Sequence, residues 1–155
     1  TLYTAGQDFI EACPYFEVGH RWLRDDGNWE GGVRNRVFGA KNILSKHNLV
    51  KHVPGSTIGG GTHMIYGAQF ADMSGVTLHF KYFHDFAESV RVEVERGVHW
   101  NNAWQYQQYD RKTQEVSDLS LHCDESIRFQ GSLQLIDLGL MKTMPAFDDF
   151  CTRRR

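Results

Sequence analysis

The chain has 155 residues, of which 41% are hydrophobic and 23% are charged, and its formal net charge is −2. This length suits a single domain with its own core, and the charge argues against nucleic acid as the main partner. No apolar run approaches the roughly 20 residues of a membrane-spanning helix, and no signal peptide is recognisable. We therefore expect a cytoplasmic protein without a transmembrane segment.

The two ends of the chain are expected to be peripheral. Residues 5–13 have the pattern of a short helix that Pro14 ends. The tail over residues 145–155 finishes in three arginines and is expected to fray. We therefore predict one domain over residues 1–155, with residues 1–15 and 145–155 at its margin.

The cysteines predict neither a disulfide framework nor a zinc site. They are odd in number and scattered, without CxxC spacing: Cys13, Cys123 and Cys151. Such a set is typical of reduced thiols in a cytoplasmic protein.

Polar and basic segments dominate the first third of the chain. Asp26-Gly27 lies between Trp22-Leu23 and Trp29, which predicts a hairpin. The following run, residues 33–38, is predicted as a strand with Arg34 and Arg36 on one face. Those two guanidinium groups could clamp phosphates, or they could belong to an exposed strand face with ordinary salt bridges.

A glycine-rich loop separates two further extended segments. Residues 43–53 are expected to be extended, and residues 63–70 form the next strand candidate. Between them, GGGTH ends in His63, where backbone N–H groups of the glycines could approach an anion. No P-loop lysine follows, so a mobile turn before a strand is an equally good interpretation.

The most informative stretch begins at Val76. Alternation over residues 76–82 predicts a strand that carries His79 and Lys81 together on its polar face. Strand ends are common ligand sites in α/β sheets, although a solvated edge explains the same pattern. A helix should follow, with Asp85 and Glu88 as its capping box and Gly97 as its stop.

The remaining elements are helical. Asn101 or Asn102 is expected to cap a second, aromatic helix carrying Trp104, Tyr106 and Tyr109. Residues 111–124 read as a polar connection, and residues 133–140 as a short helix or turn. The fold class predicted from these elements is α/β, a small mixed sheet with packed helices.

Five segments resemble the carboxyl-terminal half of a bacterial group within the glycosyltransferase family 2 superfamily. They are GGVRNRVFG, LSKHNLVKHVPGSTIGGGTH, LHFKYFHDF, VERGVHWNNAWQYQQY and SIRFQGSLQLIDLGLM. The resemblance covers roughly residues 16–141. It implies the acceptor-side half of a type A glycosyltransferase fold, which moves a sugar from a nucleotide-diphosphosugar to a glycan or related acceptor.

The resemblance also implies roles for particular residues. His79 would bind a divalent metal (Mn or Mg) and Lys81 the diphosphate. Arg34, Arg36 and His63 would line the site. Trp100 or Trp29 would be a sugar platform, although Trp100 could instead anchor the second helix in the core. An inverting transfer also needs a carboxylate base, for which the candidates are Asp26 and Glu30, unless they only build their turn.

The chain departs from the resembled family in one important respect. It contains no Asp-x-Asp motif, and the nucleotide-binding first half of the family is absent. Half a site cannot clamp the metal and the leaving diphosphate, so we expect this chain to be inactive alone.

Two other functions remain open. The chain could be a non-catalytic binding or assembly module, and its dense aromatic residues are compatible with a homo-oligomer. It could also be a small metal hydrolase built on three histidines: His63, His79 and His84. Two or three histidines alone do not specify a metal.

Overall fold

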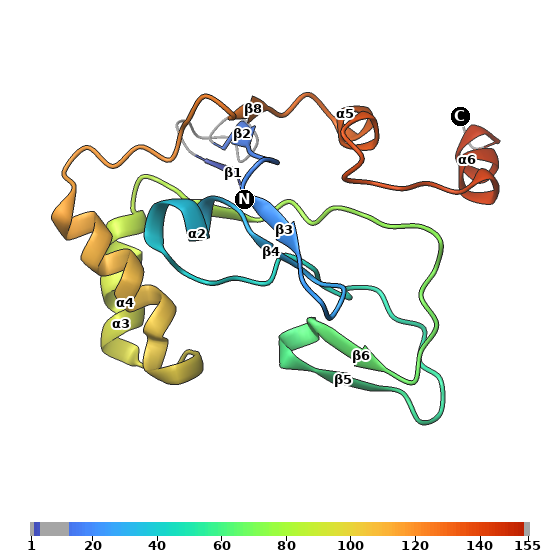
Figure 1. Ribbon diagram of the computed structural model, residues 1–155, viewed down its shortest axis with the longest axis horizontal. Helices are drawn as coiled ribbons and strands as arrows, with labels where there is room; N and C mark the ends of the chain where they lie inside the picture. Colours follow the sequence, from blue (N-terminus) through green and yellow to red (C-terminus); the bar gives the residue numbers. More distant parts are fainter. Residues whose placement is uncertain (1, 4–12, 154–155) are drawn as a thin grey trace.

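The structure is a computed structural model that describes residues 2–3 and 13–153. Of the helix expected over residues 5–13, all but Cys13 therefore lies outside the described residues. The fold is α/β, as predicted, with helices packed around small sheets (Figure 1). Helices α3 and α4 lie side by side at one end of the molecule, and α6 lies at the opposite end (Figure 1). No helix in the described residues is both long and apolar enough to cross a membrane.

The described strands form four two-stranded sheets, not one mixed sheet. Parallel pairing joins β1 (Leu2–Tyr3) to β7 (Phe80–Tyr82). The antiparallel pairs are β2 (Tyr15–Phe16) with β8 (Ile127–Arg128), β3 (Arg21–Leu23) with β4 (Trp29–Gly31), and β5 (Thr57–Gly59) with β6 (Met64–Tyr66). Only the last three residues of the strand predicted over residues 76–82 join a ladder, and of residues 63–70 only three do.

The hairpin predicted around Asp26-Gly27 is confirmed. The backbone N–H of Gly27 donates to the carbonyl of Arg24 at 3.0 Å, and Gly27 has a positive φ of 79°. The carboxylate of Asp26 accepts from the N–H of Asn28 at 3.0 Å. Glycine and aspartate therefore act here through the local turn chemistry that made the prediction possible.

The strand predicted over residues 33–38 is wrong, because this run forms helix α2 (Val33–Phe38). Gly32 and Gly39 flank the helix with φ values of 75° and 65°, which are unfavourable for other residues. The N–H of Gly39 donates to the carbonyl of Asn35 at 2.9 Å and closes the last turn. Helical geometry also buries both Val33 and Phe38, and this tertiary gain overrides the β propensity of the valines.

Helices α3 (Phe86–Arg96) and α4 (Trp100–Glu115) confirm the two predicted central helices. Gly97 ends α3 in the left-handed conformation, as predicted, but the Asp85 side chain makes no capping hydrogen bond. Helix α4 begins before its predicted caps and extends into the predicted polar connection. Its first turn contains three left-handed residues: Asn101, Asn102 and Ala103.

Shorter helices complete the fold. Helix α5 (Ser132–Asp137) confirms the helix predicted over residues 133–140. A 3₁₀ turn, η1 (Gly60–Thr62), lies between β5 and β6. The tail that was expected to fray instead forms α6 (Pro145–Thr152), whose described side chains are mostly exposed.

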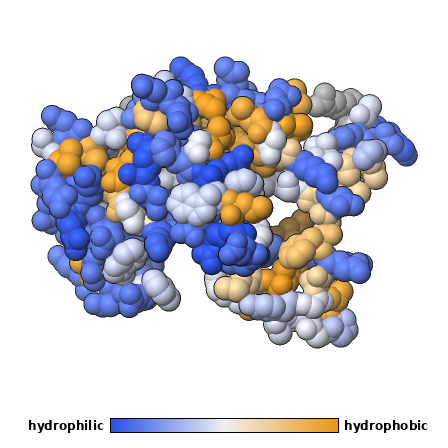
Figure 2. All heavy atoms as spheres, viewed as in Figure 1, coloured by the Kyte–Doolittle hydropathy of each residue, from blue (hydrophilic) through white to orange (hydrophobic). Residues whose placement is uncertain are grey.

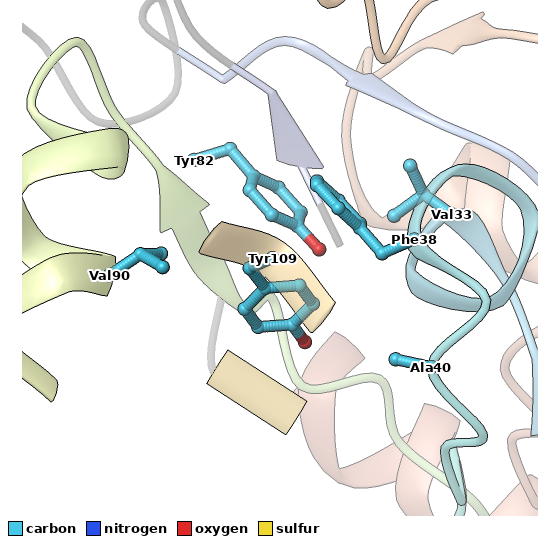
Figure 3. Packing of buried hydrophobic residues seen from close by; sticks show 6 residues of the cluster. All are labelled: Val33, Phe38, Ala40, Tyr82, Val90 and Tyr109. Atoms are coloured by element: carbon cyan, nitrogen blue, oxygen red, sulfur yellow. The ribbon is translucent and has the colours of Figure 1, made fainter. Parts of the chain in front are cut away.

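Two hydrophobic clusters form the core. The first is buried between α2, β7, α3 and α4 and consists of Val33, Phe38, Ala40, Tyr82, Val90 and Tyr109 (Figure 3). In it, the rings of Phe38 and Tyr82 stack at 5.8 Å, and Tyr109 meets Phe38 edge-on at 4.7 Å. The second cluster consists of Cys13, Phe16 and Leu135, with Leu78 and Phe80 among the half-buried side chains packed against it.

Candidate functional site

Four basic side chains from three separate segments converge beside the first core. They are Arg34 of α2, Lys46 of the long loop before β5, and His79 and Lys81 at β7; we call them the basic cluster. Partial burial and then the positive charges of Arg34 and Lys81 lower the pKa of His79 to about 4, and Lys46 adds to this effect. His79 is therefore a neutral imidazole at pH 7.

Lys81 lies against two tyrosine rings of α4. Its Nζ atom is 4.4 Å from the ring centroid of Tyr106 and 4.8 Å from that of Tyr109, and it donates to the Tyr106 hydroxyl at 3.4 Å. Burial and then the charge of Arg34 lower the pKa of Lys81 to about 8, while Glu93 opposes them. At neutral pH the ammonium form prevails, stabilised by the electron-rich ring faces.

None of the four basic side chains forms an ion pair with a carboxylate of the described residues. The Nε atom of Arg34 is buried and has no hydrogen-bond partner. Arg34 and Lys81 are half-buried, whereas Lys46 and His79 are exposed. Half-buried cations that form no ion pair attract an anion.

Two hydrogen bonds place the loop that carries Lys46. The side-chain amide of Asn48 donates to the hydroxyl of Thr77 at 2.6 Å, which holds the loop beside the residues that lead into β7. The Nδ1 atom of His63 lies 2.6 Å from the carbonyl oxygen of Ser45. His63, predicted to line the anion site, therefore fixes the backbone next to Lys46.

Arg36 does not share a face with Arg34, which corrects the expectation that both would line the site. Because residues two apart on a helix point in different directions, Arg36 turns away from the basic cluster. Its guanidinium pairs with Glu17 at 2.8 Å and donates to the carbonyl of Leu121 at 2.6 Å. Glu17 is almost completely buried, so Arg36 has a structural partner.

The two predicted catalytic carboxylates, Asp26 and Glu30, are joined by one guanidinium. Arg24 pairs with Asp26 at 3.0 Å and with Glu30 at 2.9 Å. The N–H of Asn28 is the main cause that holds the pKa of Asp26 below its ordinary value, which makes Asp26 a weaker base. Glu30 is buried. The catalytic role of both residues stays a prediction.

The two candidate sugar platforms are both accessible. Trp100 is 81% exposed, so the expectation that it anchors α4 in the core is wrong. Trp29 is 38% exposed, and the guanidinium of Arg21 lies 4.5 Å above its ring. Of the two, Trp100 follows His99, whose ring stacks on Tyr106 at 4.5 Å. Trp100 is therefore adjacent in the chain to the residue that packs on Tyr106.

The histidines do not assemble into a metal centre. Across residues 2–3 and 13–153, no three His, Cys, Asp or Glu side chains are close enough to hold one ion. His84 is exposed, and His63 has the structural contact described above. Cys13 and Cys123 are free thiols, as predicted; the side chain of Cys151 lies outside the described residues.

Three members of this site escaped the sequence analysis: Lys46, Tyr106 and Tyr109. Lys46 was visible only as one basic residue among several in an extended segment. The two tyrosines are three residues apart on a predicted helix, and this spacing did indicate that they share one face. It did not indicate that Lys81 packs against that face. Comparison of the chain with protein-family models, with curated proteins and with solved structures finds no match.

Proposed function

We propose that the basic cluster binds the diphosphate of a nucleotide-diphosphosugar, and that this domain forms part of an enzyme that transfers the sugar to a glycan or related acceptor. The observation that carries the proposal is that Arg34, Lys46 and Lys81 lie close enough for their charges to act on His79, while no carboxylate of the described residues forms an ion pair with them. The motif resemblance supports the choice of substrate and the assignment of the fold to the acceptor-side half of a type A glycosyltransferase.

The chemistry of the cluster suits a diphosphate better than a single carboxylate. A guanidinium offers paired donors to phosphate oxygens, whereas an ammonium acts as a point charge. Neutral His79 adds a hydrogen-bonding group at pH 7 without adding charge. In this proposal Trp100 stacks on the sugar ring of the acceptor, for which its exposed indole is suited.

The divalent metal that the resemblance implies does not fit the described residues alone. An imidazole is a competent ligand for Mn²⁺, but positive charges of Arg34, Lys46 and Lys81 surround His79 and would repel a cation. No carboxylate accompanies it within the described chain. We therefore assign His79 to the anion.

Substitution of the basic cluster tests the proposal. We expect Lys81→Met and Arg34→Met each to weaken binding of a UDP-sugar and of inorganic pyrophosphate by about tenfold or more, the equivalent of one lost charge-assisted contact. Methionine keeps the apolar stem of each side chain. Isothermal calorimetry at pH 7, with and without Mn²⁺, measures the affinities.

The matched control is Lys51→Met, which removes the same charge from an exposed position. If the control weakens binding as much as Lys81→Met does, the attraction is a general charge effect and the site is wrong. Circular dichroism shows whether each variant is folded. A UDP-sugar that binds no better than UMP would contradict the diphosphate assignment.

The alternative function is a non-catalytic binding or assembly module. It is favoured by exposed apolar side chains on residues 57–70, which include β5 and β6 and which we call the β5–β6 arm. Ile58, Tyr66 and Phe70 are each more than half exposed, and Figure 2 shows apolar residues at the surface of this arm. Binding of a glycan without any nucleotide, or concentration-dependent dimerisation in analytical ultracentrifugation, would support the module.

A further inference from the structure

A continuous series of contacts connects an acidic residue of α3 to Lys81. Oε2 of Glu93 lies 2.7 Å from Nε2 of His99, and Oε1 accepts from Arg96 at 2.7 Å. The His99 ring stacks on Tyr106 with an angle of 25° between the ring planes. Tyr106 in turn contacts Lys81 through both its ring and its hydroxyl.

We propose that Glu93 and His99 are positioning residues for the basic cluster: His99 fixes the Tyr106 ring on which Lys81 lies, and Glu93 supplies the negative charge that keeps Lys81 protonated. The inference rests on the proposed anion site. It assigns roles to Glu93 near the end of α3 and to His99 in the turn before α4.

The electrostatic half of the inference follows from the groups that face Lys81. Arg34 from α2 lowers the pKa of Lys81, and Glu93 from α3 is the group that raises it. Tyr106 and Tyr109 of α4 are neutral, since burial raises both their pKa values, and neutral His79 comes from the same strand. Removing the charge of Glu93 therefore lowers the pKa of Lys81 below about 8.

The geometric half depends on two restraints on Tyr106. Its ring is half-buried between His99 and Tyr109, the latter at 5.7 Å. Tyr109 is held by the core, but His99 is exposed and is held by Glu93. Loss of either Glu93 or His99 therefore loosens the ring on its outer side.

The test of the electrostatic half is Glu93→Gln, with Glu95→Gln on the same helix as the matched control. The probe is inorganic pyrophosphate, and the readout is the ratio of variant to wild-type affinity from pH 6.5 to pH 8.5, in which titration of the probe cancels. At pH 6.5 Lys81 is protonated in both proteins. The affinity ratio at this pH therefore reports only the placement of Lys81 and the lost repulsion between Glu93 and the anion.

As the pH rises, Lys81 of the variant loses its proton first. We expect the ratio for Glu93→Gln to fall by about twofold up to pH 8.5, as a drop of half a unit in the pKa of Lys81 would produce, and the Glu95→Gln ratio to stay level. A ratio for Glu93→Gln that does not change with pH would overturn the inference.

The geometric half is tested at pH 6.5, where the charge of Lys81 is constant. His99→Phe keeps an aromatic ring against Tyr106, whereas His99→Ala removes it; His84→Ala is the exposed control. We expect His99→Ala to weaken pyrophosphate binding several-fold and His99→Phe to retain most of the affinity. Equal affinities for both His99 variants would contradict the positioning role.

A readout without ligand separates this inference from the proposed function. NMR of ¹³C-methylated lysines follows the Lys81 amine directly, and Lys81→Met assigns its signal. If wild type does not bind pyrophosphate, the proposed function fails, but the Lys81 titration must still move to lower pH in Glu93→Gln. If that titration does not move, the inference fails whatever the protein binds.

Discussion

Phe38→Ala is expected to lower the free energy of unfolding by about 3–5 kcal/mol, the usual cost of removing a buried phenylalanine. Phe38 is 5% exposed, and its ring contacts Tyr82, Phe86 and Tyr109. In Figure 3 its ring lies beside that of Tyr82, and the ring of Tyr109 lies close by. Its removal leaves a cavity where α2, β7 and α4 meet, and chemical denaturation measures the loss.

Phe70→Ala is the matched control for this prediction. Phe70 is 69% exposed, and its ring contacts that of His47 at 5.0 Å. The same truncation there should change the free energy of unfolding by less than about 1 kcal/mol. If both variants lose the same stability, the first cluster is not the core that the packing indicates.

Arg36→Met is expected to cost about 3 kcal/mol or more, because it removes the guanidinium that pairs with the buried carboxylate of Glu17. The side chain of Glu17 is 3% exposed and that of Arg36 is 18% exposed. Lys112→Met, which breaks a surface pair of 4.0 Å with Glu115, should cost less than about 1 kcal/mol. Urea denaturation at pH 7 compares the two variants.

A double substitution separates charge burial from lost packing. In Glu17→Gln/Arg36→Met no charge is left buried, so we expect the double variant to be more stable than Arg36→Met alone. A double variant less stable than the single variant would show that the loss comes from packing. Where the single variant folds, its pyrophosphate affinity should match wild type, because Arg36 lies outside the basic cluster.

Elements with local signals could be predicted from the sequence. The Asp26-Gly27 turn and the Gly97 stop depend on residues whose backbone preferences act within a few positions. Helix α2 was not recognised, because the run is only six residues long and its two valines favour strands. The spacing of four residues between Val33 and Val37 was the helical signal that we missed. The decisive signal was the pair of glycines, Gly32 and Gly39, together with burial against distant residues.

The residues of the candidate site also divide into those with a local sequence signal and those without one. The placement of His79 and Lys81 together follows from the period of two residues in a strand, although only Phe80–Tyr82 joins the ladder. Arg34 was chosen because a strand was predicted over residues 33–38, but it reaches the basic cluster from helix α2. Lys46 arrives through the hydrogen bond from Asn48 to Thr77, which links segments 29 residues apart, and no local pattern encodes such a contact.

The short strand β7 has a consequence for how the molecule transmits a binding event. Its Phe80 packs with the second hydrophobic cluster and its Tyr82 with the first, while Lys81 lies between them. We therefore expect the two hydrophobic clusters to unfold together, because β7 contacts both of them. An anion bound to Lys81 would then slow amide hydrogen exchange not only at its binding site but also in β2, β8 and α3.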